Sequence, residues 1–238
     1  MAVDGAPETA ARETAADEAT VAGVILAAGF SRRFGPFNKL VLPVDGEPMV
    51  RRVATVALEA GLAPVVVVTG HQADAVWTAL EGLPVDFVHN PAAQTGLASS
   101  LVAGVRALPE AVVGAAILLA DMPRVKSATV RVVAEALGLG AREPATREPG
   151  IREPGIGGTV SVPVHDGRRG NPVAWGRAHF GEILALEGDR GARDLLDRHP
   201  SCVVEVPVDD PGVLRDVDTL QAWEAEGREP RAAAPDSG

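Results

Sequence analysis

An apolar run at residues 21–26 (VAGVIL) is the feature that most constrains the fold of this chain. The run is rich in β-branched residues and has almost no polar interruption, which is typical of a strand buried on both faces of a parallel sheet. Small and then cationic residues follow it: Ala27, Ala28, Gly29, Arg32, Arg33 and Lys39. Small side chains let backbone N–H groups approach an anion closely, and Arg and Lys add charge and directed donors. The stretch therefore predicts a strand and a loop that could hold a triphosphate, although a plain turn with solvated cations fits the same pattern.

Two common phosphate-binding motifs are excluded for this loop. A Walker loop needs G-K-[ST], and the dinucleotide fingerprint needs G-x-G-x-x-G, and the loop contains neither.

Strand and helix patterns alternate along the next hundred residues. Further strands are expected at 65–69, 85–88 and 115–119, and helices at 49–59, 73–80, 98–108 and 127–137. This alternation predicts parallel βαβ units, and hence an α/β, Rossmann-like, mostly parallel sheet with helices on both faces. Ligands in such sheets bind beyond the carboxyl ends of the strands. The site is therefore expected where the first four strands end, at residues 27–39, 69–71, 89–96 and 120–123.

The last third of the chain predicts shorter elements. They are a strand at 159–164, a turn at 165–170 leading into 171–175, helices at 178–186 and 188–196, an edge strand at 202–206, and a last helix capped by Thr219.

One domain is expected, at residues 21–225, because a chain of 238 residues can bury a substantial core. Residues 1–20 lack a hydrophobic period and carry five acidic residues against one arginine, so they are expected to be a disordered acidic tail. Residues 226–238 form a second polar tail. Residues 142–156 repeat the pentapeptide R-E-P-x-x three times, and a proline every five residues prevents helix and sheet. This segment is expected to be a flexible insert.

Composition excludes several classes of protein. The net charge of −10 argues against a nucleic-acid binder, and Cys202, the single cysteine, rules out an internal disulfide. No apolar stretch is long enough to span a membrane, and the acidic N-terminus does not resemble a signal peptide. A soluble cytoplasmic protein is expected. The five histidines show no metal-ligand spacing, and most are expected at the surface.

The loop after the first strand resembles a specific family motif, L-A-[AG]-G-x-[SG]-x-R-[MF]-G-x-x-x-K. The matching residues are Leu26, Ala27, Ala28, Gly29, Ser31, Arg33, Gly35 and Lys39, with Phe34 where Met is commoner. This motif opens the MobA-like nucleotidyltransferases, which are related to the molybdenum-cofactor enzymes. The resemblance, which extends to about Trp223, implies that the loop wraps the nucleotide phosphates and that Arg33 and Lys39 neutralise them.

Two aspartates match the places where that family holds its catalytic Mg²⁺. Asp121 lies in Leu119-Ala120-Asp121-Met122-Pro123, which resembles the family's L-x-D-x-P, and Asp218 lies in a D-V-D-T segment that resembles D-[IV]-[DN]-T. Carboxylates are the ligands that Mg²⁺ prefers. From the residues alone, Asp121 could instead be a turn or capping residue, and Asp216 remains an alternative to Asp218.

Further matches imply contacts with the nucleotide. Asn90 and the segment with Gly96, Ser99 and Ser100 resemble the family's N-x(n)-G-x-x-[SA]-S, and Thr69 and Gly70 lie where the second strand meets the nucleotide. Both serines could equally cap a helix.

Two later segments bear on the second substrate. Residues 167–172 (GRRGNP) resemble the family's G-x-R-G-H-P, but Asn171 replaces the histidine, which puts an acid–base or pterin-contacting role in doubt. Arg168 or Arg169 could meet a substrate phosphate. Residues 188–193 (GDRGAR) resemble the G-D-x-G-A-R of the cytidylyltransferase branch.

The resemblance implies an enzyme that transfers CMP from CTP to the terminal phosphate of molybdopterin cofactor and releases pyrophosphate. Arg33, Lys39 and Asp121 are the expected catalytic residues, and a molybdoenzyme or its chaperone is a candidate partner. The resemblance favours CTP over GTP as the substrate, because Ala28 stands where the guanylyl branch usually has glycine. A guanylyltransferase, a sugar- or polyol-phosphate nucleotidyltransferase, and a non-catalytic cofactor carrier are the alternatives.

Overall fold

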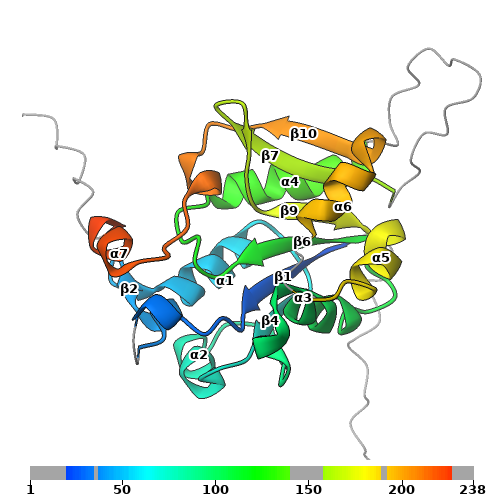
Figure 1. The fold of residues 1–238 in the computed structure, drawn as a ribbon. Coiled ribbons are helices and arrows are strands. Elements are labelled where there is room, and N and C mark those ends of the chain that lie inside the picture. Colours follow the sequence, from blue (N-terminus) through cyan, green and yellow to red (C-terminus); the bar gives the residue numbers. More distant parts are fainter. Residues whose placement is uncertain (1–19, 35–36, 140–157, 189–191, 227–238) are drawn as a thin grey trace, which may run out of the picture.

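The computed structural model describes residues 20–34, 37–139, 158–188 and 192–226, and a central sheet between two layers of helices organises them (Figure 1). The strands are β1 (Val21–Ala27), β2 (Pro43–Val44), β3 (Glu47–Pro48), β4 (Val65–Thr69), β5 (Asp86–His89), β6 (Gly114–Leu119), β7 (Val160–His165), β8 (Arg168–Arg169), β9 (Val173–Gly176) and β10 (Val203–Pro207). The helices are α1 (Met49–Glu59), α2 (Ala73–Ala79), α3 (Leu97–Arg106), α4 (Ser127–Leu139), α5 (Phe180–Leu184), α6 (Arg193–Arg198) and α7 (Leu220–Glu226).

The sheet is mixed but mostly parallel, which confirms the predicted fold class. Its order is β10-β7-β9-β6-β1-β4-β5, and β8 pairs with β7. The pairs β6–β1, β1–β4, β4–β5 and β7–β10 are parallel, whereas β9 runs antiparallel to both of its neighbours. β10 lies at one edge of the sheet, as expected.

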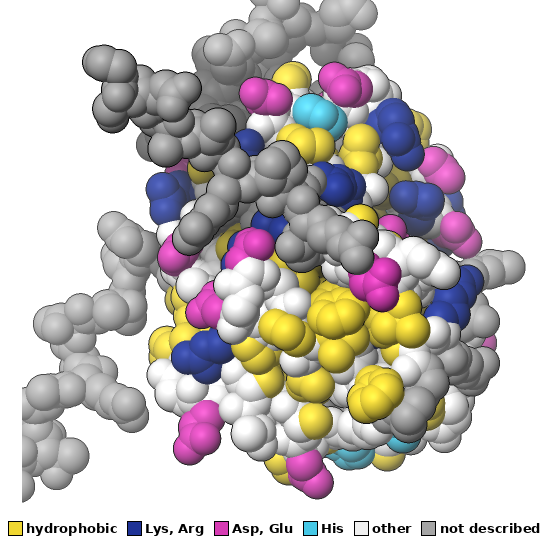
Figure 2. Space-filling model, turned by 90° about the vertical axis from the view of Figure 1, so that its left-hand side faces the viewer, with side chains coloured by type: hydrophobic (Ala, Val, Ile, Leu, Met, Phe, Trp, Pro, Cys, Tyr) yellow, Lys and Arg dark blue, Asp and Glu magenta, His cyan; other side chains and the backbone are white. Residues whose placement is uncertain are grey.

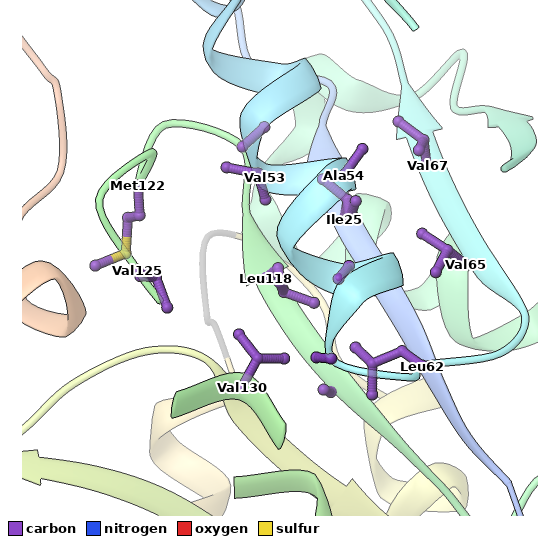
Figure 3. Close-up of a cluster of buried hydrophobic side chains, with 14 of the residues drawn as sticks. Ile25, Val53, Ala54, Leu62, Val65, Val67, Leu118, Met122, Val125 and Val130 are labelled. Carbon is purple, nitrogen blue, oxygen red and sulfur yellow. The ribbon is translucent and has the colours of Figure 1, made fainter. Parts of the chain in front are cut away.

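Alternate residues of each central strand enter different cores, which explains why these strands are apolar throughout. Ile25 and Val67 pack with α1, α2 and α4, whereas Val24 and Val68 pack with α3, α5 and α6. Figure 3 shows the first of these clusters, in which α1 lies across β1, β4 and β6. Every one of these four valine and isoleucine side chains is at most 2% exposed. A strand covered on both faces has no polar side and therefore shows no alternation.

The register brings the four predicted strand ends to one edge. Ala27 is paired with Thr69, Thr69 with His89, and Leu26 with Leu119, so β1, β4, β5 and β6 end side by side. The arrowheads of β1 and β6 point to the left in Figure 1, toward α7.

Several element boundaries differ from the predictions. The predicted turn at residues 43–48 is a small hairpin of β2 and β3, and β8 forms within the turn predicted at 165–170. The helix predicted at 178–186 is a 3₁₀ turn, Arg177–His179, followed by α5. Thr219 caps α7 as predicted, because its Oγ1 accepts a hydrogen bond from the Ala222 N–H at 3.1 Å. In the described part of the chain, no helix has both the length and the apolar character needed to cross a membrane.

Both predicted tails lie almost wholly outside the described residues, and so does the R-E-P-x-x segment, between α4 and β7.

We expect replacement of residues 142–156 by a Gly/Ser linker of equal length to change neither the melting temperature nor turnover measurably. The segment offers no apolar face to bury, and an equal length keeps the loop-closure entropy similar. Thermal unfolding and steady-state rates would test this. A clear loss of either would show that the segment packs on the domain or meets substrate.

Candidate active site

A cleft of about 530 Å³ opens where β1 and β6 end. Its walls come from the loop after β1, from the segment before and within α3, and from the ends of β6 and of the segment before α7. Figure 2 views the molecule from this side, where hydrophobic side chains gather near the centre and charged groups surround them. The volume lies within the range of small-molecule sites.

Lys39 stands at the charged centre of this cleft. Its Nζ donates to Asp121 Oδ2 at 2.7 Å, to Asp218 Oδ1 at 2.8 Å and to the carbonyl oxygen of Val217 at 3.0 Å. The structure therefore joins the predicted phosphate-binding lysine to both predicted metal ligands. Asp218, rather than Asp216, is the carboxylate that contacts Lys39.

The loop after β1 holds the Lys39 backbone in place. Ser31 adopts a left-handed conformation with φ of 49°, and its Oγ accepts a hydrogen bond from the Lys39 N–H at 3.1 Å. Asn38 Oδ1 accepts another from the Leu40 N–H at 3.0 Å. Because the neighbouring Leu40 is buried in the core, the backbone of Lys39 is held in place.

Val217 positions the second aspartate. Its side chain is buried with Phe34, Val44 and Met49, and its N–H donates to the Asp121 carbonyl oxygen at 2.9 Å. These two anchors place Asp218 beside Asp121 although the two are 97 positions apart in the chain.

The charges of the cluster reinforce one another. Burial lowers the pKa of Lys39, but the charge of Asp121 and the hydrogen bonds to Asp121 and Asp218 outweigh it and raise the pKa above its usual value. The Lys39 hydrogen bond in turn lowers the pKa of Asp218. Burial and the neighbouring Asp218 carboxylate raise the pKa of Asp216. At neutral pH, Lys39 is therefore a cation and Asp218 an anion.

The donor set of this cluster fits a divalent cation such as Mg²⁺. Two carboxylates converge on one ammonium group, so their oxygens already accommodate a positive charge between them. Oxygen donors of this kind suit a hard cation. Asp121 and Asp218 could hold the ion, which would compete with Lys39 for the same oxygens.

Arg33 lies at the mouth of the cleft. Its side chain is 70% exposed, and its Nη1 is 3.4 Å from Asp218 Oδ2. Such a weakly held guanidinium can turn toward an arriving phosphate and donate two parallel hydrogen bonds.

The other predicted nucleotide-binding residues divide into two groups. Leu26, Ala28, Gly29, Gly96 and Ser100 line the cleft. Ala27, Thr69, Gly70 and Asn90 do not line it; Ala27, Thr69 and Asn90 are buried.

Asn90 organises the loop beneath the cleft. Its Nδ2 donates to Ser99 Oγ at 2.9 Å and Ser100 Oγ at 3.0 Å, and its Oδ1 accepts from the Ala92 N–H at 3.0 Å. This network fixes the start of α3, and with it Ser100, which faces the cleft.

Some residues that line the cleft lie in the predicted site segments but were not singled out there. Among them are Phe30, in the loop after β1, and Gln94 and Leu97, in the segment at residues 94–100. Phe30 stacks on His71, with ring centroids 5.2 Å apart. A loop residue such as Phe30 follows no periodic pattern, and only the tertiary structure turns it toward the site.

Comparison with known proteins identifies the family. The MobA-like NTP transferase domain matches residues 23–203, which include most of β1, the loop that follows it, Lys39 and Asp121. The chain belongs to the MobA-like NTP transferase family. As a member of this family it is a nucleotidyltransferase, and the family resemblance of the sequence is confirmed.

Relatives of this MobA-like nucleotidyltransferase carry different names. Nicotine blue oxidoreductase of Paenarthrobacter nicotinovorans is 29% identical over 84% of this chain and 93% of its own length. The crystal structure of Rv0371c from Mycobacterium tuberculosis H37Rv has a TM-score of 0.71 and 28% identity, over 90% of this chain and all of that one. A nucleotidyl transferase from Methanothermobacter has a TM-score of 0.70 and 26% identity, over 87% and 95% of the two chains.

A second structure of the mycobacterial relative is a complex with manganese. It has a TM-score of 0.68 and 26% identity, again over 90% of this chain and all of that one.

Proposed function

We propose that this MobA-like enzyme transfers CMP from CTP to the terminal phosphate of molybdopterin cofactor, with release of pyrophosphate and with Mg²⁺ at Asp121 and Asp218. The observation that carries the proposal is the contact of Lys39 Nζ with both carboxylates in a cleft of nucleotide size. Resemblance of the opening loop and of residues 167–172 and 188–193 to molybdenum-cofactor enzymes supports the second substrate.

The reaction needs little proton transfer from the protein. A phosphate monoester has its second pKa near about 6, so the attacking oxygen is already anionic at neutral pH. Catalysis then depends on positioning and on stabilising charge, as in other phosphoryl transfers.

Residues of the chain supply most of that stabilisation. The small residues of the β1 loop, Ala28 and Gly29, line the cleft and admit close approach of the phosphates. Arg33 and Lys39 would hold the β- and γ-phosphates, and their charges would stabilise the leaving pyrophosphate. The divalent ion, when bound, would neutralise charge on the transferred phosphate.

Asn171 lies in a small cavity that adjoins the cleft. Asn171 and Pro172 share a small cavity with Met122 and Leu119, and Leu119 also lines the main cleft. The Asn171 N–H donates to the Val213 carbonyl oxygen at 2.9 Å. An amide there could hydrogen-bond a pterin or phosphate group, but it could not act as a general acid.

The proposal is tested with purified protein, molybdopterin cofactor, Mg²⁺ and each of CTP, GTP, ATP and UTP. Pyrophosphate release and the mass of the product are the readouts, and formation of the cytosine dinucleotide is expected. Turnover with GTP alone would favour a guanylyltransferase, and turnover only with a sugar or polyol phosphate would reassign the second substrate. Tight cofactor binding without turnover would favour a carrier.

An oxidoreductase is the second candidate, because of the name of the relative from Paenarthrobacter. Bleaching of nicotine blue by this chain with a nicotinamide reductant would support it. The cationic and carboxylate groups of the cleft favour nucleotidyl transfer, since they match a triphosphate and a hard cation.

Ala28 is the proposed determinant of CTP preference. Ala28 lines the cleft and is 4% exposed. It also packs closely on Gly70, since a Cβ atom added to Gly70 would lie 2.9 Å from the Cβ atom of Ala28. We expect Ala28→Gly to lower the CTP-to-GTP ratio of kcat/KM about tenfold, the scale of one methyl group in a binding pocket. Ala92→Gly removes a methyl group outside the cleft lining and serves as the control. An unchanged ratio in Ala28→Gly would remove Ala28 as the discriminator.

A further inference from the structure

A second cluster of chemically active side chains lies away from the cleft. His179 and Glu182 belong to the segment of α5, and His199 follows the end of α6. In Figure 1, α5 and α6 lie on the right, whereas α7 and the arrowheads of β1 and β6 lie on the left. The proposed reaction uses none of these three residues.

The ligand atoms of this cluster are already close together. One atom from each of His179, Glu182 and His199 lies within 4.8 Å of the other two. His199 Nε2 is 2.7 Å from Glu182 Oε1, and the two imidazole rings have centroids 5.2 Å apart. Ligands of a tetrahedral ion with bonds of about 2.1 Å are about 3.4 Å apart. Small rotations of three side chains would therefore satisfy that geometry.

Local structure prearranges two of the three residues. His179 and Glu182 are three positions apart, which places them on one face of a helical turn. The His179 side chain is buried at 6% exposure, and its Nε2 is 3.0 Å from the Gly158 carbonyl oxygen. A hydrogen bond from this nitrogen to a carbonyl leaves Nδ1 as a lone-pair donor, which is how proteins orient metal-binding histidines.

His199 and Glu182 form a close pair, in which His199 Nε2 lies 2.7 Å from Glu182 Oε1. That nitrogen is inaccessible to solvent and makes no other hydrogen bond with the described residues. An imidazole nitrogen and a carboxylate oxygen that already face each other at this distance are two donor atoms that one divalent ion could bind together.

We propose that His179, Glu182 and His199 bind a divalent transition-metal ion, with Zn²⁺ the best fit. Two imidazoles and one carboxylate form a three-ligand zinc set, with the fourth position open to water. Nitrogen donors disfavour Mg²⁺, so this site differs in metal preference from the carboxylate pair in the cleft. The ion would tie the α5 segment to the end of α6, and this role goes beyond the proposed reaction.

Cobalt is the best probe, because it replaces zinc and reports tetrahedral nitrogen–oxygen ligation by its visible absorption. The full chain carrying Asp121→Asn and Asp218→Asn, which removes the carboxylate pair of the cleft, is freed of metal with a chelator and titrated with Co²⁺. We expect one equivalent to bind with tetrahedral absorption, to be displaced by Zn²⁺, and to persist in excess Mg²⁺. Zn²⁺ should also raise the melting temperature, because it binds the folded state.

Glu182→Gln on the same background is the decisive variant, because this side chain is 38% exposed and its exchange should not prevent folding. The dissociation constant for Co²⁺ should rise at least about 100-fold, and more than the loss of a supporting residue would cause. His199→Gln should act in the same way. His165→Gln is the control, because His165 is a half-buried histidine whose ring nitrogen lies 3.1 Å from the Val208 carbonyl oxygen, outside the cluster. This variant should bind Co²⁺ with unchanged affinity. Equal affinity in Glu182→Gln, or octahedral absorption alone, would overturn the proposal.

Discussion

Asp121→Asn should lower kcat by about 10²–10³ while the protein stays folded. Asparagine keeps the shape of the side chain but loses the negative charge that attracts both Lys39 and a divalent ion. The loss should appear mainly in kcat, since charge at the transferred phosphate grows as the transition state forms. Its size is that of removing one preorganised electrostatic group. Steady-state kinetics over a range of Mg²⁺ concentrations, with thermal unfolding alongside, are the measurements.

Asp45→Asn is the matched control for this variant. Asp45 also pairs with cations, Arg124 at 2.6 Å and Arg52 at 3.3 Å, but it does not line the cleft. Its exchange should leave turnover unchanged. Normal turnover of Asp121→Asn at limiting Mg²⁺ would show that the metal assignment is wrong. Unfolding of the variant would instead make Asp121 a structural residue of the strand end.

The fold could be predicted because its central strands carry a strong local signal. β1 and β4 are short apolar runs, and such runs need cover on both faces, which implies helices in two layers. β2, β3 and β8 were not predicted. A strand of two residues has no period to detect, and pairing with a partner elsewhere in the chain is what defines it.

The site was predicted only in part, because the sequence indicates which residues end a strand but not whether their side chains line the cleft or are buried beneath it. The family motif placed Thr69 and Asn90 at strand ends near the nucleotide, and the structure places both at that edge but buries them. Nothing in the local sequence distinguishes a side chain that lines a cleft from one that supports its wall. Asn90, for example, bonds two serines, of which only Ser100 lines the cleft.

The parts of the site that the sequence did not predict depend on long-range contacts. The pairing of Lys39 with Asp121 and Asp218 depends on the register of β6 beside β1 and on the anchoring of Val217, neither of which a linear pattern contains. The histidines illustrate the same limit. They were expected mostly at the surface, yet His179 is buried, since α5 and α6 bring its ring against His199.

Lys39→Ala should weaken CTP binding and, without nucleotide, strengthen metal binding. The Nζ of Lys39 and a divalent ion need the same oxygens of Asp121 and Asp218, so removing the ammonium removes a competitor for the ion. The same change removes a cation that meets the triphosphate already in the ground state, so KM should rise together with a fall in kcat.

Calorimetry with Mn²⁺ on the nucleotide-free protein separates these two effects, because it measures the ion without turnover. We expect the dissociation constant for Mn²⁺ to fall about tenfold in Lys39→Ala, and kcat/KM for CTP to fall about 10³-fold or more, since both ground-state and transition-state contacts are lost. Lys126, the chain's other lysine, supplies the control, because its Nζ donates to the Asp209 carbonyl oxygen at 3.0 Å, away from the cleft lining. Lys126→Ala should change neither the dissociation constant for Mn²⁺ nor kcat/KM. Weaker metal binding in Lys39→Ala would contradict the competition, because it would mean that Lys39 holds the two carboxylates in place for the ion and does not exclude it from them.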